Sequence, residues 1–206
     1  MASKIIVDQL EKTGGALTAL TLPVANATAN QILKNDGAGA LSWTAQPTAG
    51  LAECDQWYLP TDFTGSVFPI TTMARVNFGP YGSPAGTVGT GMGHSAGTFS
   101  FPSTGKWLII FHMLASATTT ADSDVSALIK FSINTGGSYT QNAADGTTTA
   151  AIGANNNCNA TAIYLMDVTN ITTHLVQVGC ALEHSGNTVQ GSADDTSTNV
   201  TFIKVS

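Results

Sequence analysis

The segment Gly97-Thr-Phe-Ser-Phe-Pro-Ser-Thr-Gly-Lys-Trp-Leu-Ile-Ile-Phe-His112 gives the strongest indication of the fold. A short strand at residues 98–101 is followed by a turn at residues 102–105 and then by an apolar run at residues 106–114. The run is apolar at both sets of alternating positions, as in a central strand that is covered on both faces. The sequence therefore predicts a central strand inside a layered β-structure.

Further strand candidates lie on either side of this segment, at residues 74–78, 126–134, 163–168, 174–182 and 199–205. Apolar and polar residues alternate in several of them, as in strands with one buried face. Seven or eight short strands over about 150 residues, with turn-rich joints and no amphipathic helix, predict an all-β sandwich or jelly roll. The residues expected to pack in its core or at a trimer contact are Phe99, Phe101, Trp107, Ile109, Phe111 and Phe202.

Residues 1–50 have a different pattern, with short apolar stretches separated by turn formers. The turn Asn35-Asp36-Gly37-Ala38-Gly39 lies between two strand-like pieces and predicts a β-hairpin, because Asp-Gly supplies the positive φ that the turn needs. Such fragments are too short to form a core, so they should pack against copies of themselves or a docking partner. Pro47-Thr48-Ala49-Gly50 is the expected linker between a docking arm, residues 1–50, and a head, residues 51–206. The apolar residues expected to make the arm's contacts are Ile5, Ile6, Val7, Leu20, Leu22, Ile32, Leu33, Leu41 and Trp43.

Two stretches resemble known families. Residues 31–43, preceded by Leu20-Thr-Leu-Pro23, resemble a segment of phage fibre and appendage proteins, in which a Gly-Gln-Val-Leu-like strand, an Asp-Gly turn and a Leu-Ser-Trp strand recur near the attachment end. Asn30 stands where those proteins often have Gly. Residues 97–112, together with the terminal Val200-Thr-Phe-Ile-Lys-Val205, are similar to the complement-type and tumour-necrosis-factor-like heads, with Trp107 where Tyr is usual. The resemblances imply a homotrimer with a ten-stranded jelly-roll head and a tip that binds other molecules.

Composition supports large subunit contacts and excludes several classes of function. Charged residues make up 10% of the 206 residues, where a typical soluble domain has about 25%. The seven basic residues do not cluster and the formal net charge is −6, so nucleic-acid binding is not expected. No apolar run is long enough to span a membrane. The N-terminus, Met-Ala-Ser-Lys-Ile-Ile-Val-Asp, does not read as a signal peptide, so we expect assembly in a bacterial cytoplasm.

Catalytic and metal-binding chemistry is not expected. No nucleophile elbow occurs, and His112 and His174 lie in strand candidates where ordinary sheet residues are the expectation. The glycine-rich residues 86–93 lack the Lys and helix of a phosphate loop. The carboxylates in polar loops have three alternative roles: they are solvated, bind calcium or form the catalytic pair of a glycoside hydrolase. The aromatic residues near loops either stack on sugar rings or pack at subunit contacts. These carboxylates are Asp122, Asp124, Asp194 and Asp195, and these aromatics are Trp57, Tyr58, Tyr81 and Tyr139.

The function expected from the sequence is that of a bacteriophage virion structural protein without a cofactor. It would be a trimeric surface appendage, either a fibre or a capsid decoration, that docks through its N-terminus to capsid or tail proteins. Host recognition through a surface glycan or protein is expected for a fibre and dispensable for a decoration. A small polysaccharide depolymerase is the alternative, and a secreted cytokine-like ligand is disfavoured by the phage-like arm.

Overall fold

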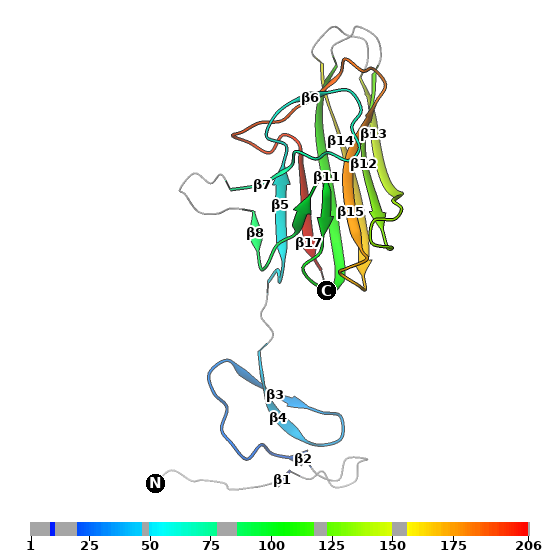
Figure 1. Cartoon of the computed structure of the whole chain (residues 1–206). Coiled ribbons are helices and arrows are strands. Elements are labelled where there is room, and N and C mark those ends of the chain that lie inside the picture. Colours follow the sequence, from blue (N-terminus) through cyan, green and yellow to red (C-terminus); the bar gives the residue numbers. More distant parts are fainter. Residues whose placement is uncertain are drawn as a thin grey trace. The chain divides into compact units, whose positions relative to one another are not determined.

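The computed structural model describes residues 9–10, 20–46, 50–77, 86–117, 123–149 and 156–205. The chain forms two compact units, residues 1–50 (the arm) and residues 51–206 (the head) (Figure 1). All secondary structure in the described ranges consists of strands joined by turns and bends. Of the residues assigned to the arm, Ile5, Ile6 and Val7 lie outside the described residues, as do residues 47–49 of the expected linker.

The arm contains two antiparallel pairs, β1 (Gln9–Leu10) with β2 (Leu20–Thr21) and β3 (Gln31–Asn35) with β4 (Leu41–Ala45). The second pair is a hairpin at the place where the Asp-Gly turn predicts one. Gly37 has a φ of +87°, which glycine adopts without strain. The Asp36 carboxylate accepts hydrogen bonds from the amides of Ala38 and Ala40 at 2.7 and 3.0 Å, and these bonds close the turn.

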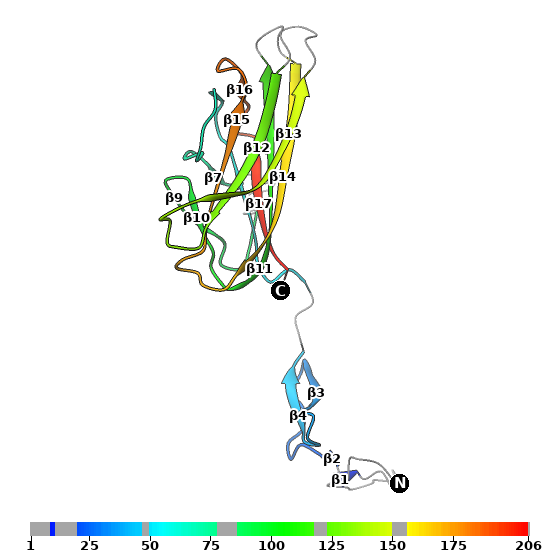
Figure 2. The ribbon, with the colours of Figure 1, turned by 90° about the vertical axis from the view of Figure 1, so that its right-hand side faces the viewer.

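The head is a sandwich of two antiparallel sheets (Figures 1 and 2). The five-stranded sheet has the order β13-β12-β15-β10-β9. Its strands are β9 (Gly93–Ser95), β10 (Thr98–Ser100), β12 (Ser123–Ser132), β13 (Thr140–Thr149) and β15 (Leu175–Leu182). The eight-stranded sheet has the order β6-β16-β11-β17-β5-β7, with β14 on the other edge of β11 and β8 against β5. Its strands are β5 (Cys54–Tyr58), β6 (Phe63–Thr64), β7 (Ala74–Arg75), β8 (Thr87–Val88), β11 (Gly105–Ala117), β14 (Asn156–Val168), β16 (Thr188–Val189) and β17 (Asn199–Lys204).

The core lies between the two sheets and is filled by the inward-facing residues of each. Phe99 packs with Trp57 and Phe202 at ring-centroid distances of 5.5 and 5.0 Å. Phe101 packs on Trp107 at 5.3 Å. All six residues expected at the core or at a trimer contact belong to this single-chain core: Phe99, Phe101, Trp107, Ile109, Phe111 and Phe202.

The sequence patterns place the buried faces of several long strands correctly, but they miss β5, β13 and the two- and three-residue strands β6, β8, β9 and β16. Strand β13 was not predicted, because its sequence is polar and its Asp145-Gly146 pair is typical of a turn. Its pairing with β12 holds it in place, and the Asp145 carboxylate accepts a hydrogen bond from the Thr161 amide of β14 at 2.8 Å. Strand β5 was also missed, because its buried face carries an aspartate, Asp55, beside Trp57.

Candidate self-association face of the head

The outer face of the eight-stranded sheet carries apolar side chains that the head does not cover. In β11, Trp107, Ile109, Phe111 and Met113 are fully buried in the core. The alternating residues point away from the core and remain only half-buried: Leu108, Ile110, His112 and Leu114. The sequence predicts cover on both faces of this strand, and a single chain provides cover on one.

Paired residues on five neighbouring strands form a continuous row on this outer face, because directly paired residues point to the same side of a sheet. The row joins Leu165 of β14 to Leu108 of β11 and Ile203 of β17, and continues to Cys54 of β5 and Val88 of β8. Leu165 is 54% exposed and Val88 is 46% exposed. We call these five residues the apolar row.

The next two rows of the same face become increasingly polar without becoming charged. Ile163, which is 58% exposed, pairs with Ile110, and Ile110 pairs with Thr201. Gln56 donates a hydrogen bond to the Thr201 hydroxyl at 3.1 Å. In the third row, His112 Nδ1 and the Thr161 hydroxyl lie 2.8 Å apart. The face therefore combines apolar contact area with a few polar groups that can fix its orientation.

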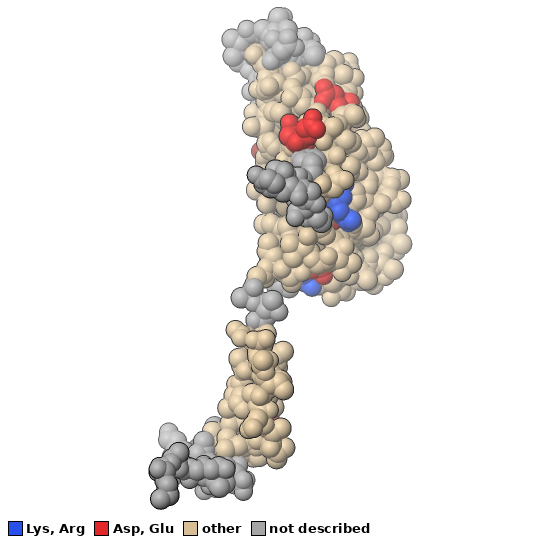
Figure 3. All heavy atoms as spheres, turned by 90° about the vertical axis from the view of Figure 1, so that its left-hand side faces the viewer, with Lys and Arg blue, Asp and Glu red and all other residues tan. Residues whose placement is uncertain are grey.

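Charge on this face is confined to its border. Lys106 and Asp167 are paired in the register and form an exposed ion pair at 3.2 Å, one row beyond the apolar row. The three rows described above contain no Lys, Arg, Asp or Glu. Burial, together with the neighbouring Asp55, raises the pKa of the Cys54 thiol, which keeps this residue of the row neutral. Charged residues are also sparse on the side of the molecule drawn in Figure 3.

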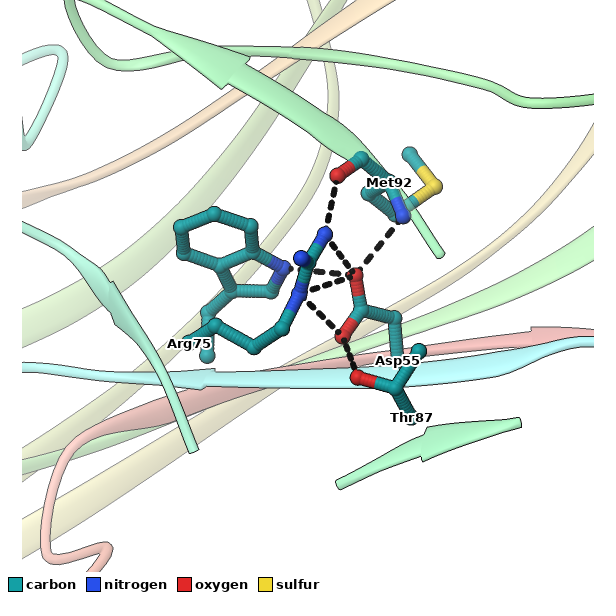
Figure 4. A network of polar contacts seen from close by, with 5 residues as sticks. Asp55, Arg75, Thr87 and Met92 are labelled. Atoms are coloured by element: carbon teal, nitrogen blue, oxygen red, sulfur yellow. Dashed lines mark hydrogen bonds and ion pairs between the residues drawn. The ribbon is translucent and has the colours of Figure 1, made fainter. Parts of the chain in front are cut away.

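A buried polar network holds the β5 end of the apolar row in place (Figure 4). Asp55 is fully buried and its carboxylate accepts hydrogen bonds from Trp57 Nε1 at 2.9 Å, the Thr87 hydroxyl at 3.0 Å and the Met92 amide at 2.7 Å. The Arg75 guanidinium binds the same carboxylate through Nε and Nη2 at 3.0–3.2 Å. The network thus joins β5 to β7 and β8, and so positions the strand that carries Val88.

The buried carboxylate also restricts the turn that follows β8. Gly91 has a φ of +76°, and a Cβ there would lie 2.9 Å from Thr87 Cγ2 and 3.0 Å from Asp55 Oδ2. Only glycine fits this position without displacing the network. Asp55 therefore has a structural role in the head, with its oxygens fully used by neighbouring donors.

None of the described arm residues of the predicted docking set is fully buried. Ile32 and Leu33 are 41% and 45% exposed. The remaining described members are half-buried: Leu20, Leu22, Leu41 and Trp43. No apolar side chain is buried among residues 20–46, where Gly39 is the single buried residue.

The aromatic residues predicted near loops and the three cysteines differ in how far they are buried. Trp57 and Tyr58 are buried, so they pack and do not stack on a sugar. Tyr139 is half-buried, with its hydroxyl 3.5 Å from the Thr98 hydroxyl, and Tyr81 lies outside the described residues. Cys54, Cys158 and Cys180 are all free thiols, and Cys158 and Cys180 are buried.

The carboxylate and histidine candidates are not brought together into one site. Asp195 accepts hydrogen bonds from Ser197, which lower the pKa of its carboxyl group. Asp124 begins the pairing of β12 with β15, and Asp122 lies outside the described residues. Within the described ranges no three His, Cys, Asp or Glu side chains gather as metal ligands. Those ranges also contain no helix that could span a membrane.

Comparison with known proteins identifies the fold. No family model matches the sequence, and no curated protein matches it. The structure is similar to Eiger TNF from S. frugiperda, with a TM-score of 0.55 at 6% identity, over 76% of this chain and 94% of that chain. It is also similar to murine APRIL, with a TM-score of 0.52 at 10% identity, over 74% and 98% of the two chains. The chain therefore contains an all-β jelly-roll sandwich of the tumour-necrosis-factor type.

Proposed function

We propose that this protein is a homotrimeric surface appendage of a bacteriophage virion, in which the head drives assembly and the arm attaches the trimer to the particle. The observation that carries the assembly part is the outer face of the eight-stranded sheet. Its apolar row crosses five strands, and its three rows hold no charged side chain. A contiguous exposed apolar patch of this kind is typical of a protein contact surface.

Two further copies of the same chain are the occupants that this face fits best. A partner of another kind would have to match a surface without charge, whereas a copy of the chain presents the same uncharged rows. The sequence resemblance of residues 97–112 to trimeric heads, together with the jelly-roll fold, supports three copies. Burying Leu165, Ile163 and Val88 removes apolar area from water, at about 25 cal/mol per Å².

The virion part of the proposal is supported by residues 31–43, which resemble phage appendage proteins, and by Val24, which is fully exposed in the segment before the hairpin. Three heads in one trimer, and many trimers on one particle, would allow weak contacts with a host glycan or protein to suffice. No group of side chains in the described residues favours a depolymerase over this structural role.

Substitutions of two isoleucines with similar exposure test the assembly face in the full-length chain. Ile163 is 58% exposed on the face, and Ile133 is 60% exposed beyond the end of β12 in the other sheet. We expect Ile163→Asp to convert the trimer to a monomer in light scattering, because the substitution buries a charge at the contact. Ile133→Asp should remain trimeric. A trimer in both variants would place the contact elsewhere.

The attachment role is tested on phage particles whose genome encodes this chain. An antibody raised against residues 51–206 should label intact particles in electron microscopy. Removal of residues 1–50 from the gene should abolish labelling and leave soluble trimers. Particles that remain unlabelled although the full-length chain is produced would overturn the virion role and leave the assembly face untouched.

A further inference from the structure

The arm hairpin has an apolar face that the arm itself does not cover. The register pairs Leu33 with Trp43 and Asn35 with Leu41, so Leu33, Leu41 and Trp43 lie on one face. The opposite face is mixed and carries Ile32, Lys34, Ser42 and Thr44. We call Leu33, Leu41 and Trp43 the arm face.

Residues 20–30 order this face without closing it. The Trp43 indole donates a hydrogen bond to the Ala25 carbonyl at 2.7 Å, and the Thr21 amide donates to the Gly39 carbonyl at 2.9 Å. These bonds hold the hairpin against the preceding segment. Leu33 nevertheless stays 45% exposed, and Val24 is fully exposed.

A hairpin with so little burial does not stay folded alone. Isolated two-stranded hairpins are marginal in water, and at least three strands with a common apolar face are needed for stability. Since Gly39 is the single buried residue among residues 20–46, we expect contacts with another chain to complete the unit. The completing surface must be apolar, because the residues to be covered are Leu, Leu and Trp.

The charges of the hairpin allow close approach of identical copies. Residues 20–46 contain two charged side chains, Lys34 and Asp36, and their formal charges cancel. Copies of this segment therefore do not repel one another, although the whole chain carries a formal charge of −6. A neutral apolar face is well suited to pack against its own copies.

The connection to the head raises the concentration of these copies. Eight residues separate Ala45, the end of β4, from Cys54, the start of β5. Such a segment extends over at most about 28 Å. In a trimer of heads, three hairpins would be confined within this reach, which corresponds to effective concentrations on the order of millimolar.

We propose that the arm faces of three chains pack on one another to form a trimeric stalk, so that Leu33, Leu41 and Trp43 serve self-association. This inference rests on the proposed trimer of heads. It divides the arm into two parts. The hairpin belongs to the assembly, and attachment to the particle is left to the segment before it.

Hydrogen exchange at residues 31–45 of the full-length chain tests the stalk. In the trimer we expect these amides to exchange at least about tenfold more slowly than in the Ile163→Asp monomer, because local opening must break contacts between three arms. Rapid exchange in the trimer would overturn the stalk. Equal protection in trimer and monomer would overturn it as well, because the arm would then be stable alone.

Two adjacent residues on opposite faces of β4 provide the matched variants. Leu41→Asp should abolish the protection of residues 31–45, whereas Ser42→Asp should retain it. Light scattering should show a trimer for both variants, because the head contact is intact. Protection that survives Leu41→Asp contradicts the stalk. A monomeric wild-type chain contradicts the proposed trimer of heads instead, so the two failures are distinguishable.

Discussion

The head of this chain and the described hairpin of its arm are both made of strands, but they differ in how far those strands are buried. In the head, the inward-facing residues of two sheets form one core, in which Phe99, Trp107 and Phe202 are fully buried. Among arm residues 20–46 no apolar side chain is buried. The difference shows that the free energy of folding is concentrated in residues 51–206. We therefore expect residues 20–46 to depend on contacts with other chains.

The largest effect is expected from a cavity in the head core. Phe99→Ala removes a fully buried ring that packs on Trp57 and Phe202, and should cost about 3–5 kcal/mol of unfolding free energy. Urea unfolding of residues 51–206 measures this loss of unfolding free energy. Trp43→Ala in the full-length chain should leave the unfolding midpoint of the head unchanged, and a large shift there would contradict the independence of the two units.

Loss of the buried carboxylate should have an effect of similar size. Asp55→Ala leaves Arg75 and the donors from Trp57, Thr87 and Met92 without their shared acceptor. The Arg75 side chain is 40% exposed and can be solvated, but each buried donor that loses its acceptor costs about 1–3 kcal/mol. The unfolding free energy of residues 51–206 reports this loss. An Asp55→Ala head as stable as wild type would mean that water replaces the carboxylate.

The pH dependence of the head should depend on His94, which packs against Trp57 and Phe99 at 4.9 and 4.6 Å. Its Nε2 is buried without a hydrogen-bond partner, and burial lowers the pKa of the imidazole below its ordinary value of 6.5. Two charged groups of opposite sign face the cluster through Trp57: Arg75 lies over its ring, and Asp55, the ion-pair partner of Arg75, accepts a hydrogen bond from its indole N–H.

The unfolded chain binds the proton more readily than the folded head, so unfolding free energy should fall as the pH decreases below about 6.5. His94→Gln should weaken this dependence between pH 7 and pH 5. Denaturant titrations of both proteins at several pH values measure the difference. Identical pH profiles would show that other groups control acid stability.

The smallest effect is expected at the exposed ion pair. Lys106 and Asp167 are 52% and 60% exposed, and such pairs contribute about 0–1 kcal/mol. A double-mutant cycle of Lys106→Ala and Asp167→Ala in residues 51–206 measures the coupling. A value above about 2 kcal/mol would indicate that the pair is covered in the assembled protein, since covered pairs couple more strongly.

The sequence predicts strands correctly where apolar and polar residues alternate, because that alternation depends only on which face of the strand is buried. Alternation in β15 places Val176, Val178 and Cys180 in the core, as the structure has them. Strand β13 was missed because pairing with β12, and not its own composition, makes it a strand. The pairing register between strands that are distant in the chain cannot be read from a single sequence. The apolar row, which that register defines, could therefore not be predicted.

One signal of the candidate face was nevertheless present in the sequence. The run at residues 106–114 is apolar on both faces, and Ile163 and Leu165 alternate with residues of the buried face in β14. The structure covers one face of each strand and leaves Leu165 54% exposed. Apolar residues on the second face of a central strand thus indicated a surface that a single head leaves open.

The mass of residues 51–206 in solution tests self-association of the head most directly. This unit has its own core and can be studied without the arm. We expect light scattering to give three times the chain mass at micromolar concentration, with or without residues 1–50. A monomer after removal of residues 1–50 would contradict the assembly face on the eight-stranded sheet and would assign assembly to the arm.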